Sequence, residues 1–208
     1  SESIFSKIKT SILKRDFINR IFLKIITSLE HSLLKKYIGK HNKKYKNISK
    51  LFNHSLKVNV IKSKSKLVYR YSDSDIKLIK SMKLDLILRC GGGIHRGEIL
   101  NSARLGIISF HHADNRINRG GPPGFWEIYE RAPTTGFTIQ ILTDELDGGN
   151  VLKRGAFLTR FCYLLNQADL YKKANYYMKD LLLKISLKES LPKYQDTYIY
   201  SKRLYKTP

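Results

Sequence analysis

The sequence predicts an α/β fold in which a mainly parallel sheet is flanked by helices. Residues 84–88 form a compact apolar run, which is typical of a strand buried on both faces. A glycine-rich loop and a helical segment at 96–104 lead to a second apolar run at 105–110, which is the order of a βαβ unit. Residues 161–185 then repeat apolar side chains at helical spacing, which predicts a long helix that covers the sheet.

The N-terminal elements follow from periodicity and capping signals. Residues 17–34 place apolar side chains three and four positions apart between lysines, which predicts a helix. Residues 56–61 alternate apolar and polar side chains, which predicts a short strand. Ser72, with aspartates in the turn after it, predicts the start of a helix that runs through Met82.

The C-terminal half adds one helix and two strands. Pro122 suits the first turn of a short helix over 122–129. The apolar runs at 136–142 and 151–159 predict two further strands.

Composition supports a globular body. The chain has 208 residues, of which 42% are hydrophobic, and this is enough for one α/β core. We divide it into a basic helical segment (1–55), an α/β domain (56–190) and a basic tail (191–208). Cys90 and Cys162 are too few for a disulfide framework, so we expect reduced thiols and a cytoplasmic location.

The charge is large but uneven. The formal net charge is +22. Residues 1–50 hold 13 Lys and Arg against 3 acids, whereas residues 105–150 hold 3 Arg against 6 acids. The basic residues therefore flank the chemically rich centre, and nucleic-acid binding is not the favoured reading. Weak association with an anionic membrane surface is open on the same grounds. No pattern in the sequence sets the oligomeric state.

The polar residues that can do chemistry follow predicted strands. His111 and His112 come directly after the run at 105–110, and Asp147 lies in the acidic turn after the strand at 136–142. Sites in α/β proteins lie at strand ends, so we expect His111 and Asp147 to meet there. A histidine beside a carboxylate is typical of acid–base chemistry. No two candidate ligands show a familiar metal-binding spacing, so no metal site is expected.

These motifs, in this order, resemble the folate-dependent formyltransferase family. Its signature is a strand ending in Asn-x-His, a loop with Arg-Gly, and a threonine-containing strand that ends in an acidic turn. Here Ser109 and His111 end the strand, Arg119 precedes Gly120, and Thr138 lies in the strand before the turn at 143–149. The likeness covers residues 84–155. It implies a Rossmann-like formyltransferase domain.

The resemblance also implies a reaction and a site. The domain would move a formyl group from 10-formyltetrahydrofolate to a substrate amine, and the acceptor we expect is an amino sugar on a nucleotide carrier. His111, Asp147 and Ser109 would form the catalytic set. The cofactor would contact Gly91, Gly92, Gly93, Ile94, Asp144, Glu145 and Leu146. The acceptor would contact His112, Asn115, Arg116, Asn118 and Arg119.

Two departures from the family pattern affect these expectations. Ser109 stands where the family has asparagine, and the loss of one such hydrogen-bond donor costs about 10²–10³ in rate, unless Asn115 or Asn118 compensates. No strand is expected before Leu56, so the domain as given is expected to lack its opening strand-helix-strand unit.

Alternative readings therefore stay open. One is a catalytically inactive formyltransferase-like module that binds or scaffolds. Another is a methionyl-tRNA formyltransferase-like enzyme. His111 and Arg116 each have a purely structural reading as well, because buried histidines and arginines are often only hydrogen-bonded.

Overall fold

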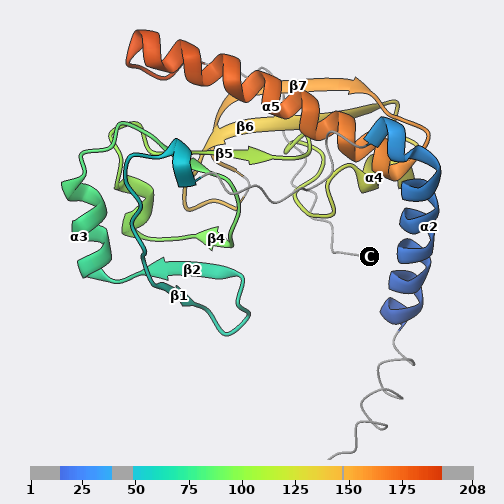
Figure 1. Cartoon of the computed structure of the whole chain (residues 1–208), viewed down its shortest axis with the longest axis horizontal. Coiled ribbons are helices and arrows are strands. Elements are labelled where there is room, and N and C mark those ends of the chain that lie inside the picture. Colours follow the sequence, from blue (N-terminus) through green and yellow to red (C-terminus); the bar gives the residue numbers. More distant parts are fainter. Residues whose placement is uncertain (1–14, 39–48, 147, 194–208) are drawn as a thin grey trace, which may run out of the picture.

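The computed structural model describes residues 15–38, 49–146 and 148–193, and it confirms the α/β class (Figure 1). The helices are α2 (Arg15–Ile38), α3 (Asp73–Ser81), α4 (Phe125–Tyr129) and α5 (Tyr163–Lys188), with short 3-10 helices η1 (Ser49–Leu51) and η2 (Glu98–Asn101). The strands are β1 (Val60–Lys62), β2 (Val68–Tyr71), β3 (Ile87–Arg89), β4 (Ile94–His95), β5 (Ile107–His111), β6 (Thr134–Ile141) and β7 (Asn150–Leu158).

The larger sheet has the strand order β3-β5-β6-β7. The predicted parallel pairing of β3 with β5 is present, with Ile87 opposite Ile107, but the helix expected between them is not, so the βαβ unit is confirmed only in its strands. The pairs β5–β6 and β6–β7 are antiparallel, so the expectation of a mainly parallel sheet was wrong for the described strands. The physical reason is the connection between β5 and β6. A parallel neighbour usually needs a crossover helix over the sheet face, whereas this connection packs its loop on the polar face of β6 and contains only the five-residue α4.

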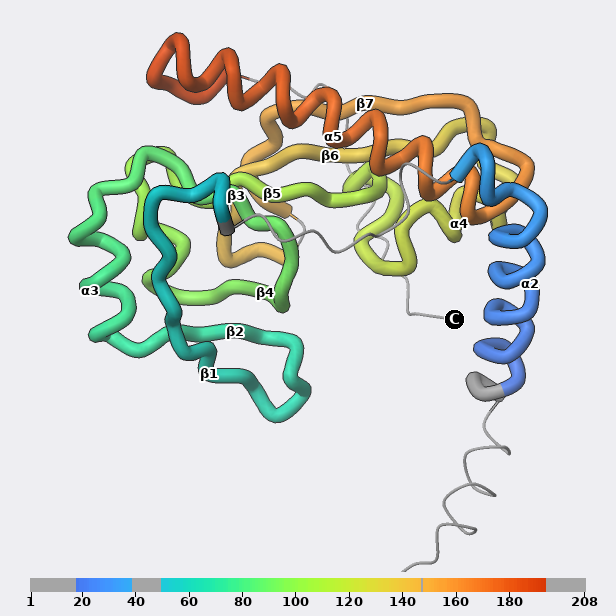
Figure 2. Tube along the Cα trace, in the orientation of Figure 1, coloured from blue at the N-terminus to red at the C-terminus, as the bar shows by residue number. Residues whose placement is uncertain are grey.

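Helix α5 covers one face of this sheet, as the trace in Figure 2 shows. Ile108, Phe137 and Ile139 are at most 1% exposed and pack with Leu170 and Met178 of α5. Each fully buried side chain of this size contributes roughly 1.5–3 kcal/mol. The long C-terminal helix and the strands under it are therefore confirmed as the core.

The opposite face of β6 is polar although it is buried. Thr138 and Gln140 are at most 1% exposed and face the loop after β5, where Thr138 Oγ1 donates to the Ala113 carbonyl. Gly136 permits this close approach, because a Cβ there would lie 2.8 Å from Cβ of Asp114. The loop that carries most predicted site residues is thus held against the sheet.

A second, smaller sheet has the order β1-β2-β4 and packs beside α3 (Figure 1). The sequence predicted β1, although the strand begins four residues later than expected. It did not predict β2 and β4, and the helix expected at 96–104 is only the short η2. Glycine explains β4: a Cβ on Gly93 would lie 2.3 Å from the Leu67 carbonyl oxygen, so only glycine lets the two segments pair.

Both predicted N-terminal helices are present. Ser72 caps α3, because its Oγ accepts from the Asp75 N–H. Helix α2 meets the start of α5, where both carboxylate oxygens of Glu30 accept from the Tyr163 and Leu164 N–H groups at 3.0 and 2.6 Å. A carboxylate at a helix N-terminus is favourable, so this contact anchors α2. None of the helices within the described ranges is long and apolar enough to span a bilayer.

Candidate active site

His111 ends β5 and is nearly buried, at 9% exposure. Its Nε2 lies 2.7 Å from the Asn118 carbonyl oxygen. A carbonyl only accepts, so this contact requires a proton on Nε2. In the neutral ring, Nδ1 then carries the lone pair.

A buried carboxylate faces this histidine from α4. Glu127 is 6% exposed, and its Oε1 accepts from Asn118 Nδ2 at 2.9 Å. Burial raises the pKa of Glu127, while the hydrogen bond from Asn118 and the charge of His111 act in the opposite direction. Asn118 therefore contacts both groups, the imidazole through its carbonyl and the carboxyl through its amide. Its own Oδ1 is buried without a hydrogen-bond partner.

Ser109 lies two residues earlier on the same face of β5 and is 1% exposed. Its Oγ accepts from Arg89 Nη1 at 3.0 Å and donates to the Phe110 carbonyl at 3.2 Å. Nη2 of Arg89 also donates to the carbonyls of Gly92 and Gly93, at 3.1 and 2.9 Å. A guanidinium thus joins Ser109 to the glycine-rich loop.

An open cleft of about 520 Å³ lies at this edge of the sheet. Its walls include Arg89, Gly91, Ser109 and two aromatic side chains beside His112. The His112 ring stacks on Phe110, with centroids 5.3 Å apart, and meets the Tyr171 ring edge-on at 4.8 Å. Ser109, His112 and Gly91 therefore share one cleft. His111 is not among its lining residues and points toward Asn118 instead.

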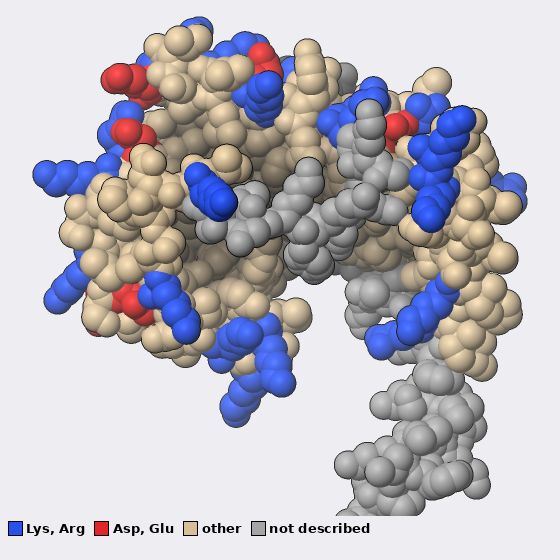
Figure 3. Space-filling view, viewed as in Figure 1, with Lys and Arg blue, Asp and Glu red and all other residues tan. Residues whose placement is uncertain are grey.

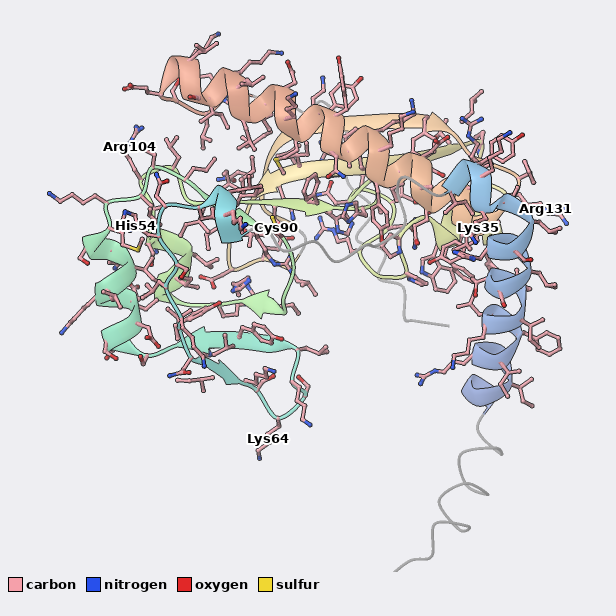
Figure 4. The ribbon with its side chains drawn as sticks, in the orientation of Figure 1. Lys35, His54, Lys64, Cys90, Arg104 and Arg131 are labelled. Atoms are coloured by element: carbon pink, nitrogen blue, oxygen red, sulfur yellow. The ribbon has the colours of Figure 1, made fainter. Side chains whose placement is uncertain are left out.

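The glycine-rich loop is surrounded by open space at Gly91 and is tightly packed at Gly93. Nothing lies within 4 Å of a Cβ on Gly91, which follows Cys90 (labelled in Figure 4) at the mouth of the cleft. Gly93 is instead pressed against β2, and Ile94 belongs to β4. Only the first part of the predicted cofactor loop thus faces open space.

Behind β5, the predicted acceptor residues form a buried charge network. Asp114 accepts from Arg116 Nε at 2.9 Å and lies 3.7 Å from Arg154 Nε. Burial alone raises the pKa of Asp114, but the hydrogen bonds and charge of Arg116 and the charge of Arg154 outweigh it and lower that pKa. Asn115 is 2% exposed, and its Oδ1 accepts from Arg154 Nη2 at 2.8 Å. The network therefore commits Arg116 and Asn115 to contacts within the protein.

Arg119 links two predicted site segments. Its Nε donates to the Asn115 carbonyl at 2.8 Å, and its Nη1 donates to Glu145 Oε1 at 3.0 Å. Glu145 belongs to the acidic turn together with Asp144, which is mostly exposed and lies 3.7 Å from Arg96. Leu146 of the same turn is 38% exposed. The structure thus brings the Arg-Gly loop against the acidic turn.

The predicted meeting of His111 and Asp147 is not tested, because Asp147 lies outside the described residues. No group of three metal-binding side chains occurs in the described ranges. Cys90 and Cys162 are free thiols.

Sequence reasoning missed Arg89, Glu127, Arg154 and Tyr171. Position offered a signal for two of them: Arg89 directly precedes the glycine-rich loop, and Glu127 is an acid inside an otherwise apolar short helix. An acid among apolar residues of a buried helix is rare unless it has a partner. No comparable signal marked Arg154 or Tyr171.

Part of the sequence is similar to known formyltransferases. The methionyl-tRNA formyltransferase of Bacillus subtilis is 31% identical over 81 residues, which is 38% of this chain and 26% of the relative. The chain resembles the formyltransferase family. No family model matches it. The matched stretch spans about a quarter of the length of this relative.

Solved formyltransferase structures align with larger parts of the chain. A sugar N-formyltransferase from Shewanella is 22% identical with a TM-score of 0.48, covering 62% of this chain and 53% of that one. The formyltransferase PseJ from Anoxybacillus kamchatkensis, solved with a UDP-linked formamido sugar and tetrahydrofolate, is 16% identical with a TM-score of 0.45. That alignment covers 59% of this chain and 64% of PseJ.

Proposed function

We propose that this chain is an N-formyltransferase that moves a formyl group from 10-formyltetrahydrofolate to a substrate amine. The observation that carries the proposal is the buried array of His111, Asn118 and Glu127 at the end of β5. It places an imidazole near a carboxyl whose pKa is raised by burial. Paired groups of this kind are typical of acid–base sites.

The reaction requires the transfer of one proton from the attacking amine to N10 of the folate. The amine nitrogen attacks the formyl carbon, and the carbonyl oxygen becomes an oxyanion. The bond between that carbon and N10 of the folate then breaks, while the proton lost by the amine passes to N10. Nε2 of His111 is committed to the Asn118 carbonyl, and His111 does not line the cleft, so we assign this proton transfer to Nδ1 acting through a water molecule. Asp147 stays our proposed partner for it.

Arg89 can replace the hydrogen-bond donor that is lost because Ser109 stands where the family has asparagine. The Ser109 hydroxyl donates to the Phe110 carbonyl, so its proton is not directed at a ligand. Arg89 donates to Ser109 and brings a full positive charge to the cleft wall. Charge near a developing oxyanion stabilises the transition state. We propose that Arg89 supplies the stabilisation expected from the family's asparagine.

The proposed acceptor is an amino sugar on a nucleotide carrier. The 520 Å³ cleft combines the rings of Phe110, His112 and Tyr171 with the charge of Arg89. Aromatic rings stack on nucleobases, and arginine binds phosphate. These groups therefore fit the base and the phosphates of the nucleotide carrier.

A matched pair of histidine variants tests the proposal. The chain is incubated with 10-formyltetrahydrofolate and a panel of acceptors, namely amino-sugar nucleotides and methionyl-tRNA, and formyl transfer is measured by mass spectrometry. His111→Ala is expected to lower turnover by about 10²–10⁴, because general acid–base groups contribute that much. His54→Ala, at an exposed position, is expected to leave it unchanged. Equal rates for both variants would remove His111 from the mechanism.

Two other functions have an observation in their favour. Similarity to methionyl-tRNA formyltransferases favours tRNA as the acceptor, and turnover on methionyl-tRNA alone would establish it. The burial of His111 and the internal bonding of Ser109 favour a binding module without catalysis. Calorimetry that detects tetrahydrofolate binding, together with no turnover on any amine, would select that module.

A further inference from the structure

Helix α2 carries an outward apolar face that no described part of the protein covers. Figure 1 shows the helix projecting from the body near the start of α5. The exposed fractions are 51% for Ile18, 61% for Phe22, 51% for Ile25, 59% for Leu29 and 79% for Leu33. These positions are three or four residues apart, so the side chains form one continuous stripe along the helix.

The stripe is distinct from the face that holds α2 in place. Leu23, Thr27, Glu30 and Leu34 are half-buried, and Ile38 is 2% exposed. These residues also recur at helical spacing, on the side that meets α5, where Glu30 accepts two N–H bonds. The anchored face accounts for the docking of α2 and leaves the apolar stripe unexplained. Single exposed apolar residues are ordinary, but a contiguous stripe marks an interaction surface.

Exposed basic side chains accompany the stripe: Lys24 and Lys35 lie along one flank of it, and Lys36 lies within it. Arg20, Lys24, Lys35 and Lys36 are all exposed, and the carboxylate of Glu30 is bound at the start of α5. Figure 3 shows basic side chains beside uncharged surface on the side of the molecule where α2 lies, and Figure 4 labels Lys35 there. An apolar stripe with exposed lysines beside it is the pattern of a helix that lies in the interface of an anionic membrane.

We propose that the outward face of α2 docks the protein on an anionic lipid surface. The apolar stripe enters the headgroup region while the neighbouring lysines meet lipid phosphates. Charge favours this occupant over a second copy of the chain, because pairing two α2 helices face to face would bring like charges together. The α5 contact keeps the rest of the protein beside the surface.

Sedimentation with lipid vesicles tests the docking surface. The full chain is mixed with vesicles of phosphatidylglycerol and phosphatidylcholine, or of phosphatidylcholine alone, at low and high salt. The double variant Phe22→Gln/Leu29→Gln removes apolar area from the stripe. Leu158→Gln/Leu187→Gln removes apolar side chains of 75% and 85% exposure elsewhere and serves as the matched control. Lys24→Gln/Lys35→Gln tests the charge.

We expect the wild type and the control to bind the anionic vesicles and to release at high salt. Both α2 variants should bind at least about tenfold more weakly, since each surface lysine near anionic lipid matters at that scale. Absence of wild-type binding, or equal binding by the α2 variants and the control, overturns the proposal. So does concentration-dependent self-association in analytical ultracentrifugation that Phe22→Gln/Leu29→Gln abolishes, because the face would then join two copies.

Discussion

The two sheets of this protein differ in how deeply they are buried. In the larger sheet, β6 is buried from Thr135 to Ile141, with an apolar side under α5 and a polar side under the loop after β5. In the smaller sheet, none of the residues of β1, β2 or β4 is fully buried. The proposed catalytic residues His111 and Ser109 lie on the first sheet, whose central strand is held on both faces, as a preorganised site requires.

The largest difference between the sheets should appear in core stability. Ile139 is 0% exposed in β6, and Ile61 is 56% exposed in β1. Ile139→Ala should lower the free energy of unfolding by about 4 kcal/mol, because it removes buried methylenes and leaves a cavity. Ile61→Ala should change it by less than about 0.5 kcal/mol. Urea unfolding followed by circular dichroism measures both, and similar losses would mean that the smaller sheet belongs to the same core.

The buried charges of the larger sheet give the next prediction. Arg154→Met should cost about 3 kcal/mol, because it leaves the nearly buried Asp114 with less compensating charge and takes two donors from Asn115. Arg104→Met is the matched control. It breaks an exposed pair with Asp85, whose side chains are 52% and 71% exposed, and should cost less than about 1 kcal/mol.

The loss of stability caused by Arg154→Met should depend on pH because Asp114 is ionisable. Its pKa is lowered in the folded state, so its ionised form stabilises the protein above the ordinary pKa and this contribution is lost in acid. The difference between wild type and Arg154→Met should therefore shrink as the pH falls below about 4. A deficit that is constant from neutral pH into acid would show that Arg154 acts only through packing.

The same contrast explains which elements the sequence could predict. Strands β6 and β7 and helix α5 are long, and Ser72 caps α3 by a local rule, so these elements were predicted correctly, whereas β3 begins three residues later than the expected strand at 84–88. Strands β2 and β4 have four and two residues, and they pair because Gly93 lets β4 approach Leu67. No local pattern encodes that contact, because it joins segments about 25 residues apart.

Some residues of the candidate site could be identified from the sequence, and others could not. His111 and Ser109 could be found because the motif order placed them at a strand end. The partners of these two residues could not: Arg89 reaches Ser109 through the pairing of β3 with β5, and Glu127 reaches Asn118 through the path of a loop. The antiparallel direction of β6 also depends on that connection, which contains no long crossover helix.

A smaller effect should appear in how the stability of the protein depends on pH, and it involves Glu127 beside the larger sheet. Burial raises the pKa of Glu127 beside the larger sheet, so the folded protein holds this proton more tightly than the unfolded chain. Stability from this group is full below the ordinary carboxyl pKa and is lost as the pH rises through the raised value. Glu127→Gln, which resembles the protonated form, should flatten that loss in thermal melts from acid to neutral pH. Glu98→Gln, which changes a largely exposed carboxyl, should keep it.

The smallest expected effect comes from His95 in the smaller sheet, where stability should fall, and not rise, as the pH is lowered. The Tyr71 hydroxyl lies 3.0 Å from Nδ1 of His95, and their rings are stacked. Burial and then the charge of Arg89 lower the pKa of His95, against a backbone hydrogen bond at Gly91. The unfolded chain therefore binds the proton more tightly, and stability from His95 is lost as the pH falls from about 6.5 through the lowered value.

His95→Phe keeps the stacked ring and removes both the hydrogen bond and the proton. It should cost about 1 kcal/mol at neutral pH and less in mild acid, where the wild type has lost part of its own advantage. His54→Phe, at an exposed position, is the control. Urea midpoints at several pH values measure the difference. If His95→Phe and Glu127→Gln shift the pH dependence in the same direction, one of the two assignments is wrong, because a lowered histidine pKa and a raised carboxyl pKa require opposite slopes.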